Sequence, residues 1–220
     1  MPLPLACKGG YYTSEMLEQR NMEKPFDPGY FTERELTEAG FRRVGSNVRI
    51  ATNCTIAGLE HIEIGDHVRI DGYCTIIAAD QGYLRLGSFV HIGGYCCLFA
   101  GNGIIMSDFS GLSQGVRVYS RTDDYTGHYL TNPTVPQEYT NVASGQVSLG
   151  RHVIVGSGSV ILPSVTIGEG AAVGALSLVT KSLDEWGVYF GCPAKRIKSR
   201  SNNLLDLERR LLAELDRSAP

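Results

Sequence analysis

The sequence predicts an all-β fold, a triangular parallel β-helix of about six coils, and three observations support it. Aliphatic residues recur every six positions, most regularly at Leu149, Val155, Ile161, Ile167, Val173 and Val179. Many of the 26 glycines in the 220-residue chain directly follow such an aliphatic residue. The pattern also restarts at intervals close to one coil, 20 residues from Val44 to Ile64 and 22 from Ile64 to Leu86.

A period of six fits neither a helix nor a simple alternating strand. It fits very short strands that each point one aliphatic side chain inward, with glycine in the turns between them. The earlier runs are Val44, Ile50, Ile56 and Ile62; Ile64, Ile70 and Ile76; Leu86, Ile92, Leu98 and Ile104; and Met106, Leu112 and Val118. Three repeats make 18 residues, so the additional residues of the longer coils are predicted to be loops at the corners.

Two helices are predicted outside the coils. Residues 30–40 have Thr32 as a helix N-cap, Glu35 three positions later and Gly40 as a stop signal. Residues 203–215 place four leucines at helical spacing, which predicts an amphipathic C-terminal helix.

The predicted organisation has three parts and one insertion. An N-terminal extension with the short helix covers residues 1–43, the β-helix covers residues 44–190, and a terminal segment with the second helix covers residues 191–220. Residues 119–146 interrupt the coils and are rich in Asp, Thr, Asn and Pro. Because an insertion of this length in a regular solenoid usually has a function, we expect it to contribute to a site.

Composition excludes several classes of protein. Apolar residues make up 43% of the chain, which favours a buried core. The formal net charge is −3, so the chain lacks the basic excess that is typical of nucleic-acid-binding proteins. No apolar run has the length of a membrane span, and residues 1–10 do not resemble a signal peptide. The six cysteines show no paired spacing, so we expect reduced thiols in a cytoplasmic protein.

The end of the repeat region carries a family resemblance. Residues 173–181 read VGALSLVTK, and after a short link residues 191–198 read GCPAKRIK. Together these segments resemble the left-handed β-helix acyltransferases, most closely the branch of galactoside, maltose and surface-polysaccharide acetyltransferases. The resemblance covers residues 40–200. It implies a left-handed β-helix, a homotrimer with active sites between subunits, and acetyl-CoA-dependent O-acetylation of a sugar or a surface-polysaccharide precursor.

The resemblance also implies a set of CoA-binding residues, with no metal: Ser157, Ala175, Thr180, Lys181, Lys195 and Lys198. The first two would offer backbone contacts to the pantetheine arm, one coil apart. The next two would lie near the nucleotide end of CoA. The last two lysines would pair with its phosphates through charge-assisted bonds.

The catalytic base is sought among five histidines. In many relatives a Thr-x-His-Asp segment supplies it, but here Asp123 stands where that histidine is expected. We hypothesise that His91, at an outward corner beside glycines, is the base and that Asp123 or Asp124 of a neighbouring subunit orients it. His128 in the insertion is the alternative base.

The two remaining corner histidines, His67 and His152, lie in matched turns, Gly-Asp-His-Val and Gly-Arg-His-Val. A repeated position favours a repeated structural role.

Other functions stay open at this point. One is N-acetylation of a nucleotide-linked amino sugar on the same scaffold. Another is a zinc carbonic anhydrase, which would need three converging histidines such as His61, His67 and His91. The last is a purely structural trimeric solenoid.

Overall fold

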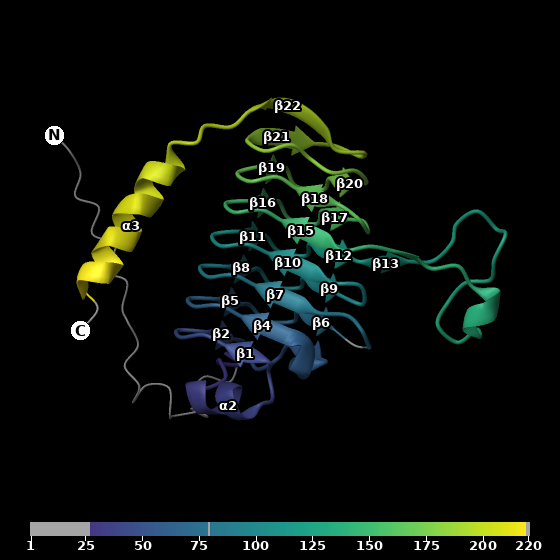
Figure 1. Ribbon diagram of the computed structural model, residues 1–220, viewed down its shortest axis with the longest axis horizontal. Helices are drawn as coiled ribbons and strands as arrows, with labels where there is room; N and C mark the ends of the chain where they lie inside the picture. The colour runs from purple at the N-terminus through teal and green to yellow at the C-terminus, as the bar shows by residue number, and fades with distance from the viewer. Residues whose placement is uncertain (1–26, 79, 219–220) are drawn as a thin grey trace.

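The computed structural model describes residues 27–78 and 80–218, and it confirms the predicted β-helix. The chain winds into a triangular solenoid of about seven turns whose walls are three parallel sheets (Figure 1). Two predictions concern residues outside the described ranges: that Cys7 is a reduced thiol and that residues 1–10 are not a signal peptide.

The first sheet contains β1 (Arg43–Val44), β4 (Ile62–Ile64), β7 (Leu84–Leu86), β10 (Ile104–Met106), β15 (Val147–Leu149) and β18 (Thr166–Ile167). The second contains β2 (Arg49–Ile50), β5 (Arg69–Ile70), β8 (His91–Ile92), β11 (Gly111–Leu112), β16 (Ile154–Val155), β19 (Ala172–Val173), β21 (Gly187–Phe190) and the antiparallel β22 (Lys195–Ser199). The third contains β3 (Thr55–Ala57), β6 (Thr75–Ile77), β9 (Cys97–Phe99), β12 (Arg117–Tyr119), β17 (Val160–Ile161) and β20 (Leu178–Val179).

The inward aliphatic residues form one continuous core. In the second sheet Ile92 pairs with Leu112, which in turn pairs with Val155, and all three are at most 1% exposed. Each of these strands has only two residues. Neighbouring coils therefore stabilise one another, because such a short strand buries its side chain only by stacking.

The structure has about one turn more than the sequence predicted. The additional rung is β21, where Val173 pairs with Tyr189. The aliphatic pattern ends at Val179 and does not reveal this rung, because an aromatic ring fills the inward position that an aliphatic residue fills elsewhere. Tyr189 is 4% exposed.

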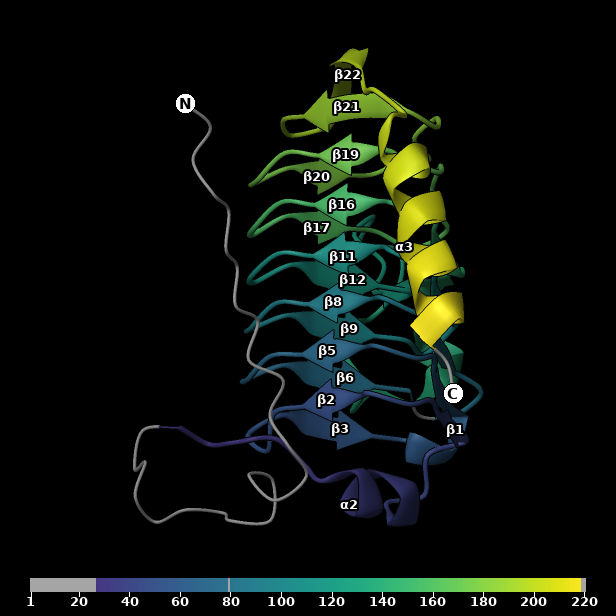
Figure 2. The ribbon, with the colours of Figure 1, turned by 90° about the vertical axis from the view of Figure 1, so that its left-hand side faces the viewer.

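Both predicted helices are present. The short helix α2 (Glu33–Glu38) begins after Thr32 with a complete capping box to Glu35. The long helix α3 (Leu204–Ser218) runs back along the stack of coils (Figure 2). Glu208 attaches α3 to the solenoid through Arg151 and His152. Within the described residues no helix is long and apolar enough to cross a membrane.

The predicted insertion projects from the solenoid as an arm (Figure 1). Its base is an antiparallel pair of strands, β13 (Arg121–Thr122) and β14 (Ala143–Ser144). A short 3-10 helix, η2 (Gln137–Tyr139), lies within it.

The corner between the first and second sheets carries a stack of rings. His67, Phe89, Phe109 and His152 occupy four successive coils, each in the left-handed backbone conformation, and their ring centroids are 4.7, 4.7 and 5.2 Å apart. The two histidines thus share the structural position that their matched turns predict.

Two glycines of the coils differ in how much space surrounds them. A Cβ on Gly65 would lie 2.6 Å from the backbone carbon of Gly87, whereas the nearest atom to a Cβ on Gly111 is the His91 carbonyl oxygen at 3.6 Å. We expect Gly65→Ala to lower the free energy of unfolding by about 1–3 kcal/mol through overpacking. Gly111→Ala is the matched control, expected within about 0.5 kcal/mol of the wild type. Urea unfolding measures both, and equal losses would contradict the backbone contacts described here.

Candidate active site

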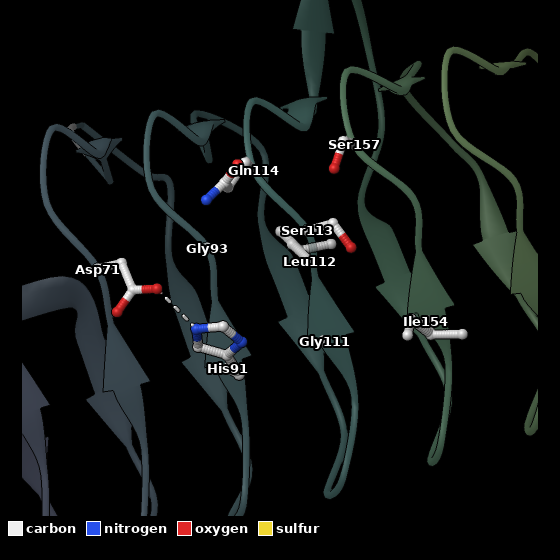
Figure 3. Close-up of a pocket in the computed structure, with 9 residues that line it drawn as sticks. All are labelled: Asp71, His91, Gly93, Gly111, Leu112, Ser113, Gln114, Ile154 and Ser157. Carbon is white, nitrogen blue, oxygen red and sulfur yellow. Dashed lines mark hydrogen bonds and ion pairs between the residues drawn. The ribbon is translucent and has the colours of Figure 1, made fainter.

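A shallow hollow of about 260 Å³ lies on the outer face of the second sheet and at its corner with the third (Figure 3). Its lining comes from four successive coils: Asp71, His91, Gly93, Gly111, Leu112, Ser113, Gln114, Ile154 and Ser157.

Part of the hollow exists because the residue at position 111 is glycine and has no side chain. In the sheet register His91 pairs with Gly111, and Gly111 pairs with Ile154. The outward positions on either side of Gly111 thus carry an imidazole and an aliphatic group, while Gly111 itself carries nothing. A reactant in this space would lie between a titratable ring and an apolar wall.

His91 forms a hydrogen bond with Asp71 of the preceding coil (Figure 3). Its Nε2 lies 2.9 Å from Asp71 Oδ2, and Arg69 Nε donates to Asp71 Oδ1 at 2.6 Å. Burial alone raises the pKa of the Asp71 carboxyl, but the hydrogen bonds from His91 and Arg69 and the Arg69 charge outweigh it and hold that pKa below its usual value. An ionised Asp71 fixes a proton on Nε2 and leaves the Nδ1 lone pair of His91 available as an acceptor.

The structure separates the predicted catalytic residues within one chain. His91 lies in the hollow, but Asp123, Asp124 and His128 lie in the projecting arm and none of them lines it. Asp124 accepts hydrogen bonds from the backbone and the hydroxyl of Thr126, and the hydroxyl bond is the main cause that lowers its pKa. Contact between the arm and His91 would therefore require a second subunit.

The residues predicted to bind CoA follow the hollow towards the C-terminal coils. Ser157 lines the hollow, and the Leu176 backbone donates to the Ser157 carbonyl, so Ala175 lies one coil further on. Backbone bonds from Leu178 to Gly191 and from Ala194 to Leu178 place the GCPA segment beside β20. Four exposed side chains surround this end of the solenoid: Thr180, Lys181, Lys195 and Lys198.

Sequence reasoning missed Asp71, which directly touches His91. The signal was available in the repeat, because Arg69 pairs with His91 and Asp71 follows two positions later at the same corner. The family resemblance pointed to the insertion instead, because Asp123 stands there in place of the family's usual histidine.

The three histidines considered for zinc are dispersed. His67 stacks on Phe89, His91 pairs with Asp71, and His61 lies 3.7 Å from Glu60. Among residues 27–78 and 80–218 no group of three His, Cys, Asp or Glu side chains is arranged to hold a metal ion.

A solenoid of six-residue repeats with a histidine–carboxylate pair in a surface hollow defines a class of transferases. Residues 146–181 match the family described as bacterial transferase hexapeptide (six repeats). The dTDP-4-amino-4,6-dideoxy-D-glucose acyltransferase of Escherichia coli is 42% identical over 179 residues, which cover 81% of this chain and 93% of that protein. The chain therefore belongs to the hexapeptide-repeat acyltransferases, and it is an acyltransferase.

Solved structures agree with this assignment. AntD, an N-acyltransferase from Bacillus cereus, in complex with dTDP and 3-hydroxybutyryl-CoA, superposes with a TM-score of 0.82 at 40% identity, over 86% of this chain and 98% of that chain. A variant of AntD in complex with dTDP-4-amino-4,6-dideoxyglucose and coenzyme A also gives a TM-score of 0.82 at 40% identity, over 86% of this chain and 99% of that chain.

The depressed pKa of Asp71 gives the site a pH signature. A carboxyl whose pKa is lower in the folded state stabilises the fold above its unfolded value of about 4, and this stabilisation is lost as the pH falls through the folded value. We expect Asp71→Asn to reduce the free energy of unfolding on the order of 1 kcal/mol near pH 7, with the difference from wild type vanishing at low pH. Urea unfolding at a series of pH values from 7 to 3 measures this. A difference that stays constant over the whole range would show that the Asp71 charge is not what stabilises.

Proposed function

We propose that the protein transfers an acyl group from acyl-CoA to the 4-amino group of a dTDP-linked 4-amino-4,6-dideoxyhexose. The observation that carries the proposal is the likeness, at 40–42% identity over most of the chain, to two acyltransferases whose names or bound molecules include this amino sugar. The hollow around His91 supplies a proton acceptor that suits the reaction.

The reaction needs little activation of the nucleophile but requires removal of a proton. A neutral sugar amine attacks the thioester carbonyl, so a C–N bond forms and the nitrogen becomes positively charged. His91 Nδ1 takes the surplus proton, while Asp71 orients the ring and stabilises its charged form. The C–S bond then breaks, and the departing CoA sulfur receives a proton from His91.

The proposed acceptor atom is nitrogen rather than oxygen. The sequence motifs favoured an O-acetyltransferase and left N-acylation of a nucleotide-linked amino sugar as the alternative. The relatives that cover most of the chain support the alternative. The VGALSLVTK and GCPAK motifs do not discriminate between the two, because they lie at the CoA end of the predicted site.

The acyl donor is proposed to lie along the C-terminal coils, and AntD holds CoA and 3-hydroxybutyryl-CoA in its structures. Ser157 and Ala175 would contact the pantetheine arm, Thr180 and Lys181 would lie near the nucleotide end, and the lysines of β22 would pair with its phosphates. In a homotrimer, the arm that carries Asp123, Asp124 and His128 would close over the hollow of a neighbour. Acetyl is the acyl group favoured by the sequence.

A comparison of two acceptor substrates, one with a 4-amino group and one with a 4-hydroxyl group, tests the proposal. With acetyl-CoA, we expect dTDP-4-amino-4,6-dideoxyglucose to be converted to its amide, and the matched nucleotide sugar with a 4-hydroxyl group to react with a kcat/KM at least about a hundredfold lower, because an alcohol is far harder to deprotonate. Mass spectrometry identifies the product and a free-thiol assay gives the rates. Equal turnover of the hydroxyl substrate would contradict N-acylation. Running both acceptors with 3-hydroxybutyryl-CoA identifies the preferred acyl group.

Three variants test the assignment of the base. We expect His91→Ala to lower kcat by about a hundredfold or more, the usual contribution of general-base catalysis. Asp71→Asn should lower kcat less and also change its pH profile, because the ring loses the charge that orients it. His128→Ala is the comparison variant and should stay close to wild type. An inactive His128→Ala beside an active His91→Ala would overturn the assignment.

A further inference from the structure

The outer face of the second sheet carries two neighbouring arginines beside the hollow. In the register of the first three coils Arg49 pairs with Arg69, and Arg69 pairs with His91. Both arginines are exposed to solvent, and the Arg69 side chain is 51% exposed. Two like charges on adjacent strands repel each other, so this pairing carries an electrostatic cost in the protein alone.

The first sheet shows a different arrangement of outward charges in the same coils. There Arg43 pairs with Glu63, and Glu63 pairs with Arg85, so a carboxylate lies between the two cations. Glu63 also forms ion pairs with Arg42 at 3.2 Å and with Arg85 at 3.7 Å. The charges of the first sheet thus alternate, whereas the two arginines of the second sheet are direct neighbours.

Contacts with neighbouring side chains orient both guanidinium groups. Arg49 Cζ lies 4.2 Å from the centroid of the Tyr30 ring, and the Tyr30 side chain also interacts with Arg69. Arg69 Nε donates to Asp71 Oδ1 at 2.6 Å, and Asp71 Oδ2 is hydrogen-bonded to His91. A tyrosine ring orients a guanidinium group without neutralising it. Together the two arginines, Tyr30 and Asp71 therefore carry a net positive charge.

We propose that Arg49 and Arg69 bind the diphosphate of the nucleotide-sugar acceptor. The inference rests on the proposed function, in which the acceptor is a dTDP-linked amino sugar. Guanidinium groups bind phosphate oxygens through paired, charge-assisted hydrogen bonds, and two adjacent groups match two linked phosphates. A bound diphosphate would also offset the repulsion between the two arginines.

The spacing of the strands suits this ligand. The 4-amino group and the diphosphate are attached on opposite sides of the hexose ring, at C4 and C1. Neighbouring strands lie about 4.8 Å apart, so the backbones of Arg69 and Arg49 lie about 5 and 10 Å from that of His91. With the amine at the imidazole, the hexose would span the first of these steps and the phosphates would lie beside the arginines.

The direction of this row separates the acceptor from the acyl donor. From His91 the two arginines lie towards β2, at the N-terminal end of the stack. The residues proposed for CoA lie on the other side of His91, from Ser157 towards β22. Figure 2 looks onto this face, with β2 near the bottom and β22 at the top. The two substrates would thus reach the imidazole from opposite ends of one face.

Variants that remove single charges test the proposal. Arg49→Gln and Arg69→Gln each remove one guanidinium group from the second sheet. Arg85→Gln is the matched control, because the Arg85 side chain is 52% exposed and lies at an outward position of the first sheet. Titration calorimetry measures the binding of dTDP, dTMP and CoA to the three variants and the wild type. Circular dichroism and the mass in solution verify fold and assembly.

We expect Arg49→Gln and Arg69→Gln each to weaken dTDP binding by roughly tenfold, the effect of losing one charge-assisted contact. Both variants should also narrow the difference in affinity between dTDP and dTMP, because the contact that they lose is to the diphosphate. Arg85→Gln should bind dTDP like the wild type. All three variants should bind CoA like the wild type.

Arg49→Gln is the decisive variant, because Arg69 also holds Asp71 and can act on the hollow through it. Unchanged dTDP binding in Arg49→Gln would overturn the proposal. An equal loss of dTDP binding in Arg85→Gln would overturn it too, because it would show a general effect of charge. Loss of CoA binding in place of dTDP binding would assign the two arginines to the acyl donor. These outcomes leave the proposed function intact, whereas a wild-type protein that does not bind dTDP would contradict the proposed function itself.

Discussion

The parallel register between coils is the constraint on which the whole structure depends. Each parallel strand of the coils contributes two to four residues, too few to form a stable element alone, so an inward side chain is buried only if it lies over its equivalent in the next coil. A slip of one residue would turn the aliphatic side chain outward. This requirement fixes Ile92 over Ile70 and Leu112 over Ile92, and it fixes every outward residue at the same time.

The candidate site is a consequence of that register. Because β5, β8 and β11 are aligned, the Asp71 carboxylate lies beside the imidazole of His91, and the bare Gly111 lies on its other side. No loop has to fold to bring these groups together. The candidate site is therefore built on paired strands and not on a loop, which favours a fixed orientation of the imidazole in the proposed proton transfer.

The same repeat explains which features of the molecule the sequence could predict. The sequence predicted the coils, both helices, the insertion and the outward position of His91, because each depends on local periodicity or capping. The last turn was missed because Tyr189 interrupts the aliphatic pattern. Asp71 was missed because coils of unequal length hide which residues become neighbours. Asp71 and His91 are 20 positions apart, and Gly115 and Gly158 are 43 positions apart, yet each pair lies in adjacent coils. The VGALSLVTK and GCPAK motifs lie at the proposed CoA end, so they left the nucleotide-linked amino sugar as an alternative acceptor and did not select it.

A stiff solenoid makes a binding site chiefly by leaving side chains out. Many coil glycines lie too close to a neighbouring coil to carry a side chain, as at Gly156, where a Cβ would lie 2.4 Å from the Ala175 nitrogen. Gly111 is different, because its φ lies outside the left-handed region and the atom nearest to its missing Cβ is 3.6 Å away. Glycine in such a position costs conformational entropy without a gain in packing. Gly111 lines the hollow that contains His91, so we infer that the space it leaves is room for a reactant rather than a need of the fold.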